Sequence, residues 1–295
     1  MTSIITSLTT TQVKALSTAT IVSLTTEDMA ALSSAQIKVL SSAQIAALET
    51  VDLATLNSSQ LSAVSAASMV GLSAAQLAVI DSSKISALGT SQIAALSSTQ
   101  VGNLSSAQIA AMTSTQIGAL TSTAIASLAT EDFATLDSAD IAAISSKAIA
   151  GLSTANVAAL TTAQLAGLST AQLAAFTTAQ IGALTTGNVA ALSTTQISAL
   201  GSTQAAALGD TQVQALTTAQ VSALSTKAIS GLSTHQIDTL GGNYAGLTTT
   251  QYAVLTSSQV TAIMSGDIDV MSTAMIASLS SKGIAGLTTA ALASF

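Results

Sequence analysis

The chain has 295 residues, of which 49% are hydrophobic and only 6% are charged, against roughly 25% charged in an ordinary soluble domain. Its net charge is −7 and it has only six Lys and Arg residues together, too few to neutralise a row of phosphates, which argues against nucleic-acid binding. The chain has no Cys, which excludes a disulfide framework and a thiolate site.

Neither a membrane-spanning helix nor a cleaved signal peptide is expected. Ser, Thr and Gln interrupt every apolar stretch before it reaches the 18 or so residues that suggest a transmembrane helix. The N-terminus, MTSIITSLTTTQVK, has no basic segment followed by an apolar one, as a signal peptide would. If the protein is exported, we expect either a route without a cleaved N-terminal signal or a chain that is part of a longer protein.

An octapeptide repeats from Leu8 to the end of the chain, as 35 octapeptides and one heptapeptide. With Leu as position 1, positions 2 and 3 are Ser or Thr, and position 4 is small. Position 5 is usually Gln, position 6 is Ile, Val or Leu, and positions 7 and 8 are small. Self-similarity at a fixed period is typical of a solenoid, whose units stack because none has a core of its own.

A single long helix cannot carry this period. Eight residues turn an α-helix by about 800°, so each repeat would rotate the apolar stripe by about 80°. A β-solenoid is the alternative fold, because Thr, Ile and Val favour strands. However, the apolar positions 1 and 6 would face opposite sides of a strand, and Ala and Gln are poor strand residues.

The octapeptide favours a short helix that begins at position 2. In the repeat that starts at Leu160, Thr161 would be the N-cap and Gln164 the N3 residue of a capping box, while Leu160 and Leu165 form a hydrophobic staple. Position 2 is Ser, Thr, Asn, Asp or Gly in 33 of 36 repeats, and position 5 is Gln in 19. The repeats without a capping residue have Glu49, Ala129 and Met264 at position 2.

The predicted fold is therefore an all-α solenoid of very short capped helices, one per octapeptide and each about six or seven residues long. We expect one domain over residues 1–295. Positions 1 and 6 should form the core, because no Asp, Glu or Lys occupies them. Position 8 should pack closely and stay small. Because Gly is not fixed at the corner, the turn should run from one helix into the next cap without a left-handed glycine.

Few places along the chain depart from the pattern. The acidic repeats at 25–28 and 129–132 place carboxylates in a first helical turn, where they complement the helix dipole. His235, the only histidine, is at position 4. With no Cys and no acidic pair beside it in the sequence, we expect it to be a surface substitution and not a ligand or base.

The register slips at 240–247, where the heptapeptide Leu240–Gly246 contains three Gly and one of the two Tyr. We expect a tolerated deletion that kinks the solenoid; the alternative is a hinge or docking spot around Tyr244 and Tyr252. Further on, Asp267 and Asp269 lie two residues apart, too few oxygen ligands for a calcium site. We therefore predict no catalytic, cofactor-binding or metal-binding residues, and no cofactor.

The repeats, for example at 96–120 and 160–184, resemble the LTTAQIAAL-type octapeptide tracts of very large bacterial, often proteobacterial, surface or adhesin-like proteins. Such proteins are commonly described as repeat-containing or as haem-utilisation or adhesion proteins. The resemblance implies secretion or surface display and a role as a stalk, scaffold or filament. Nothing in the chain supports haem binding, since it has one His and no Cys.

The predicted function is structural and not enzymatic: an extracellular or cell-surface solenoid that acts as filament subunit, stalk or adhesin scaffold. Ordinary repeats run up to both ends of the sequence, without the atypical capping repeats that usually close a solenoid. End-to-end self-association is therefore expected. The alternatives are a binding module that uses an extended surface, and a designed repeat without a biological task.

Overall fold

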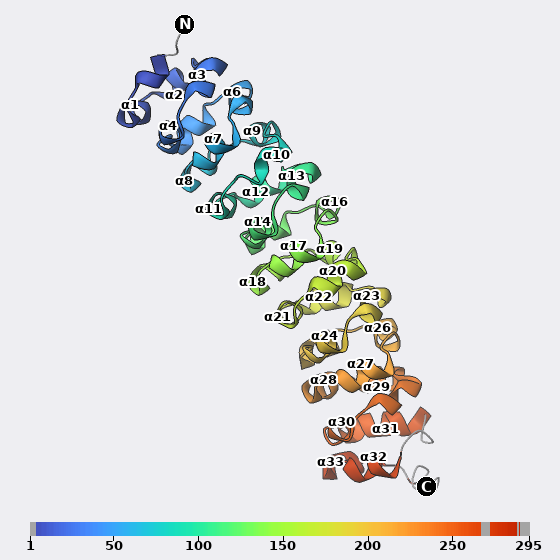
Figure 1. The fold of residues 1–295 in the computed structure, drawn as a ribbon. Helices are drawn as coiled ribbons and strands as arrows, with labels where there is room; N and C mark the ends of the chain where they lie inside the picture. The colour runs from blue at the N-terminus through green and yellow to red at the C-terminus, as the bar shows by residue number, and fades with distance from the viewer. Residues whose placement is uncertain (1–3, 267–271, 288, 290–295) are drawn as a thin grey trace. The chain divides into compact units, whose positions relative to one another are not determined.

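The computed structural model describes residues 4–266, 272–287 and 289, and these contain short helices and no β-strand. The chain divides into two compact units, Met1–Leu152 and Ser153–Phe295. Within each unit, short helices stack in successive turns (Figure 1). The predicted all-α solenoid with one short helix per octapeptide is confirmed, and the β-solenoid alternative is wrong.

The first unit contains the following helices: η1 (Ile4–Ser7), α1 (Thr10–Lys14), α2 (Thr18–Val22), α3 (Thr26–Ala31), α4 (Ser34–Lys38), α5 (Ser42–Ala46), α6 (Thr50–Thr55), α7 (Ser58–Ala63), α8 (Ala66–Met69), α9 (Ala74–Ala78), α10 (Ser82–Ile85), α11 (Thr90–Ala94), α12 (Ser98–Gly102), α13 (Ser106–Ala110), α14 (Ser114–Gly118), α15 (Ser122–Ala126), α16 (Thr130–Phe133), α17 (Ser138–Ala143) and α18 (Ser146–Ile149).

The described residues of the second unit form these helices: α19 (Thr154–Ala158), α20 (Thr162–Gly167), α21 (Thr170–Ala174), α22 (Thr178–Ala183), α23 (Thr186–Ala191), α24 (Thr194–Ser198), α25 (Ser202–Ala206), α26 (Asp210–Gln214), α27 (Thr218–Ala223), α28 (Thr226–Gly231), α29 (Thr234–Thr239), η2 (Gly241–Gly246), α30 (Thr249–Tyr252), α31 (Ser257–Gly266), α32 (Thr273–Ser278) and α33 (Ser281–Ile284).

The predicted capping box starts most of these helices. At α13, the hydroxyl of Ser105 accepts a hydrogen bond from the backbone N–H of Gln108 at 3.3 Å. The Gln108 side chain accepts in return from the N–H of Ser105 at 2.9 Å. Glu49 and Ala129 form no side-chain cap bond, as their residue types predict. Most helices have four to six residues, slightly fewer than predicted.

All the helices whose ends the structure describes, except α29, which Gly241 follows, end without a left-handed residue, as predicted. Among the described residues, only Gly241 has a positive φ, at 52°. The residue after α13, Ala111, still has right-handed helical angles, so the chain passes directly into the next extended cap residue. Helices this short are not stable in isolation, and they depend on packing between turns.

Positions 1 and 6 form the core, which confirms the prediction. In every octapeptide from Val13 to Val260, the position 6 residue is buried, and position 1 is buried in nearly all. Each helix packs against the third helix further along the chain, for example α3 against α6 and α22 against α25. A superhelical turn therefore takes between three and four octapeptides.

The prediction that position 8 packs closely holds for only some repeats. Position 8 is half-buried or exposed in every described octapeptide except the one that ends at Gly286, which is buried. It approaches the neighbouring turn closely where it is Gly: a Cβ added to Gly151 would lie 2.1 Å from the carbonyl oxygen of Ser122, and one added to Gly71 would lie 2.2 Å from that of Ser42. An Ala at position 8, as in most repeats, requires more space between the turns.

Candidate functional site

The glutamines at position 5 connect successive turns of the solenoid. In α13, Nε2 of Gln108 donates to the carbonyl oxygens of Leu77 and Ile80, both at 2.8 Å. These carbonyls belong to α9 and to the junction between α9 and α10, one turn earlier. Helix C-termini leave carbonyls without an intrahelical partner. One side chain therefore caps the start of its own helix and binds the end of a helix in the preceding turn.

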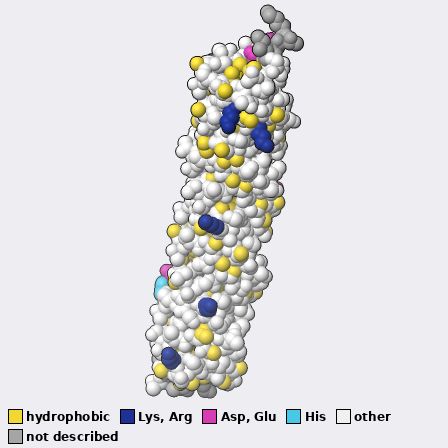
Figure 2. All heavy atoms as spheres, turned by 90° about the vertical axis from the view of Figure 1, so that its left-hand side faces the viewer, with side chains coloured by type: hydrophobic (Ala, Val, Ile, Leu, Met, Phe, Trp, Pro, Cys, Tyr) yellow, Lys and Arg dark blue, Asp and Glu magenta, His cyan; other side chains and the backbone are white. Residues whose placement is uncertain are grey.

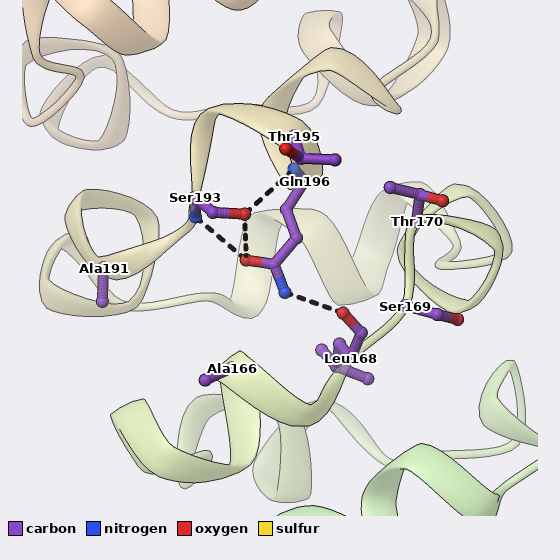
Figure 3. A pocket seen from close by; sticks show the side chains of 8 residues that line it. All are labelled: Ala166, Leu168, Ser169, Thr170, Ala191, Ser193, Thr195 and Gln196. Carbon is purple, nitrogen blue, oxygen red and sulfur yellow. Dashed lines mark hydrogen bonds between the residues drawn. The ribbon is translucent and has the colours of Figure 1, made fainter.

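Gln196, at the start of α24, shows the same geometry in the second unit (Figure 3). Its Oε1 accepts from the N–H and the hydroxyl of Ser193, at 2.9 and 3.1 Å. Its Nε2 donates to the carbonyl of Leu168 at 2.8 Å and to that of Leu165 at 2.7 Å. All the hydrogen-bonding capacity of the amide is used within the protein.

We call this series of bonds the glutamine ladder. The Nε2 atom reaches a carbonyl 28 residues earlier at 2.5–2.9 Å, a separation that becomes 27 residues for the last two glutamines. The described bonds involve Gln36, Gln44, Gln60, Gln76, Gln92, Gln100, Gln108, Gln116, Gln196, Gln204, Gln212, Gln220, Gln236, Gln251 and Gln259. All of these side chains are buried.

Sequence reasoning assigned these glutamines only to the capping box and missed the ladder. A Glu at N3 closes a capping box as well as a Gln does, yet no repeat has Glu at position 5. Only the amide can also donate to carbonyls in the turn before. The absence of Glu was therefore a signal that the glutamines at position 5 also act as hydrogen-bond donors.

Other donors replace Gln at position 5. Nζ of Lys84 donates to the carbonyl of Leu56 at 2.8 Å and to that of Ala54 at 3.0 Å. The hydroxyl of Ser68 donates to the carbonyl of Leu40 at 2.6 Å. Each reaches the carbonyl 28 residues earlier, so side chains other than Gln can supply the donor at this position.

A shallow hollow of about 320 Å³ lies beside Gln196, between two turns. Ala166, Leu168, Ser169, Thr170 and Thr195 line it together with Gln196 (Figure 3). Other hollows occur at 62–92 and 120–148. They share the same repeat positions, namely 1 to 3 of one octapeptide and 2, 4 and 5 of the third octapeptide after it. The hollow is therefore a property of the repeat and not a unique ligand site.

The ALTTAQ repeat family matches five segments of the chain, at residues 21–50, 101–130, 133–170, 162–194 and 186–218. The string ALTTAQ itself occurs at 159–164 and 215–220 and ends at the glutamine that builds the ladder. The chain is an octapeptide-repeat protein. No curated protein matches the sequence.

The surface of this repeat protein carries isolated charges. On the face drawn in Figure 2, charged and hydrophobic side chains are scattered among uncharged polar groups. The described residues contain no group of three or more His, Cys, Asp or Glu side chains that could hold a metal ion. They include no helix with the length and apolarity needed to cross a membrane. Asp267 and Asp269 lie outside the described residues.

His235 lies on the surface as expected, but it does face an acidic residue. Its Nε2 is 3.1 Å from Oδ2 of Asp210, and both side chains are exposed. Asp210 is at position 3 of the third repeat before. The sequence placed no acid beside His235, because only the stacking of turns brings residues 25 positions apart together.

The heptapeptide absorbs its missing residue locally. Residues Gly241–Gly246 form the 3₁₀ helix η2, in which Asn243 donates from Nδ2 to the carbonyl of Leu216 at 3.0 Å. Beyond it, Gln251 donates to the carbonyl 27 residues earlier at 2.6 Å. The ladder between turns therefore continues through the heptapeptide, with its spacing shortened by one residue.

Both tyrosines near the heptapeptide are buried, which argues against the alternative of a docking spot formed by their side chains. The hydroxyl of Tyr244 donates to the carbonyl of Asp238 at 2.7 Å, and that of Tyr252 donates to the carbonyl of Tyr244 at 3.3 Å. These rings fill space in the core that Ile or Val fills in other repeats.

Burial raises the pKa of Tyr252 to about 12. In a Tyr244→Phe variant, where Tyr252 is the only tyrosine, we expect little phenolate absorbance at 295 nm at pH 10.5, while the helical circular dichroism persists. In urea the same residue should ionise near its ordinary pKa of about 10. Because ionisation is disfavoured only in the folded state, stability should fall as the pH rises from about 10 to 12. Half-ionisation near pH 10 in the folded variant would contradict the burial.

Proposed function

We propose that the chain is a non-catalytic structural protein, displayed at the cell surface or outside the cell, that serves as a stalk or filament segment. The glutamine ladder carries this proposal. Successive turns present the same carbonyl acceptors and the same apolar positions, and a Gln amide donor in about half of the repeats. A structure of this kind is extended by adding equivalent turns, and its length can change without a change in its local interactions.

End-to-end association follows from the same chemistry. Gln12 is exposed, and its side-chain bonds are to Thr9, so its Nε2 can still serve as a ladder donor. A further turn that supplies carbonyls and apolar side chains would complete its interactions. That turn can come from more of the same chain or from a second copy.

Sedimentation velocity and negative-stain electron microscopy test this assembly over a wide range of concentrations. We expect concentration-dependent linear oligomers, and fewer of them for Gln12→Glu, because a carboxylate keeps the cap acceptor but removes the ladder donor. Gln214→Glu is the matched control, since this exposed glutamine lies at position 7. A monodisperse monomer at all concentrations, without filaments, would rule the filament role out. Immunogold labelling of the native cells tests the surface location.

A further inference from the structure

Four aspartates occupy the ladder position in the described residues, and one differs from the others. Asp28 accepts from the N–H of Thr25, Asp132 from the hydroxyl of Ser106 and Asp140 from the N–H of Asp137, at 3.0, 2.6 and 3.1 Å, respectively. These aspartates are Asp28, Asp52, Asp132 and Asp140. Within the part of the chain that the structure describes, the carboxylate of Asp52 accepts no hydrogen bond, and its residue is only 2% exposed.

The surroundings of Asp52 disfavour a negative charge. By the repeat spacing, the carbonyls of Ile21 and Leu24 occupy the places that bind Nε2 when position 5 is Gln. An ionised carboxylate can only accept hydrogen bonds, so it cannot bind these oxygens. A carboxylic acid carries one O–H donor and can do so.

The charged groups near Asp52 add to this effect. Its own helix α6 begins at Glu49, and α3 in the preceding turn carries Glu27 and Asp28. Helix α9, which packs on the other side of α6, has no titratable residue. The one cation close by, Lys84, binds the carbonyls at the far end of α6.

Burial raises the pKa of Asp52 above its ordinary value, and the negative charges of Glu49 and Asp28 raise it further. Asp52 is thus buried, lies where a Gln would donate to the carbonyls of Ile21 and Leu24, and has acidic neighbours. Asp132 is also buried and lies beside Glu131, but its carboxylate accepts a hydrogen bond from Ser106, which Asp52 lacks.

We propose that Asp52 is an acid-sensitive joint of the N-terminal unit: when protonated, its carboxyl becomes a donor and joins the ladder, and when ionised, it weakens the contact between α6 and the preceding turn. The contact between α6 and the preceding turn is therefore more stable in acid and becomes less stable as the pH rises. It is independent of whether the chain forms filaments.

The sign of the pH dependence follows from linkage. A carboxyl whose pKa is higher in the folded state contributes stability that is fully present below its unfolded pKa and is lost as the pH rises through its folded pKa. We expect Asp52→Gln to unfold at a higher temperature than the wild type at pH 7. The advantage should shrink toward pH 4, because the wild-type carboxyl then gains its own donor.

The matched control is Asp140→Gln, which makes the same change at the same repeat position, where the carboxylate already accepts a hydrogen bond. In Asp140→Gln, the part of the pH dependence of the unfolding temperature that Asp52 causes should be the same as in the wild type. Titration of the Asp carboxyl ¹³C signals, with Asp52 assigned by its loss in Asp52→Asn, measures the group directly in the wild type. A midpoint for Asp52 at or below its ordinary value of 3.8, or the same pH slope in Asp52→Gln and wild type, would overturn the proposal.

Discussion

Gln108→Met should destabilise the N-terminal unit by about 3 kcal/mol or more, although Met preserves the length of the side chain. The variant removes the acceptor of the Ser105 N–H and the donor to the carbonyls of Leu77 and Ile80. Each buried polar group left without a partner costs about 1–3 kcal/mol. Because repeat arrays open locally, hydrogen exchange of the amides in α9, α10 and α13 is the measurement, supported by urea unfolding.

Two controls separate the ladder from the cap. Gln12→Met removes a capping-box acceptor where Nε2 forms no ladder bond, and Gln214→Met changes an exposed glutamine at position 7. We expect a loss of about 1 kcal/mol for the first, typical of a lost cap, and almost none for the second. If Gln108→Met costs no more than Gln12→Met, the bonds between turns contribute nothing to stability.

Gly231→Ala should be strongly destabilising, and a second substitution should reverse the effect. A Cβ on Gly231 would lie 2.3 Å from the carbonyl oxygen of Ser202, so the two turns would have to separate. Overpacking of this kind typically costs about 1–3 kcal/mol. In the same repeat, position 5 is Ala228, which is fully buried and leaves the turns close together.

Gly at position 8 occurs mainly in repeats that lack Gln at position 5. The hydroxyl of Ser225 reaches the carbonyl of Leu200 at 3.2 Å, the carbonyl to which a Gln at position 228 would donate. Five octapeptides have Gly at position 8, and four of them lack Gln at position 5; the heptapeptide, which ends at Gly246, also lacks Gln there. The glycines of these five repeats are Gly71, Gly151, Gly231, Gly246 and Gly286, and an added Cβ would come within 2.1–2.4 Å of a carbonyl oxygen at each.

The double variant Ala228→Gln with Gly231→Ala should therefore recover most of the stability lost in either single variant. The longer amide holds the turns apart, and the wider space accepts the methyl group. A thermal or urea double-mutant cycle measures the coupling, which we expect to be about 1–3 kcal/mol in favour of the pair. Additive losses would mean that the two positions do not set the spacing between turns.

The local structure could be read from the sequence with few errors. The staple and the capping box involve residues within one octapeptide, such as Ser105 and Gln108, so their spacing predicts them without knowledge of the fold. The buried positions 1 and 6 follow from the absence of charge there. The helices came out shorter than predicted because the chain needs several residues of each octapeptide to turn.

Contacts between residues in different turns of the solenoid could not be predicted from the sequence. Nothing in one octapeptide tells which repeats stack, so the contact between His235 and Asp210 and the donors to Leu77 and Ile80 could not be predicted. For the same reason, the sequence did not show that the surroundings of Asp52 differ from those of the other aspartates at position 5. Three hollows between turns, at 62–92, 120–148 and 166–196, share the same repeat positions, and they too could not be predicted from one octapeptide.

The sequence by itself determined where each helix begins and which apolar side chains are buried, because capping and staple contacts span only three to five residues. Only the tertiary structure decided that the glutamine amide has a second function, since its carbonyl partners lie 28 and 31 residues away. That separation depends on how many helices complete a superhelical turn. The number is set by packing between turns, which no single octapeptide encodes.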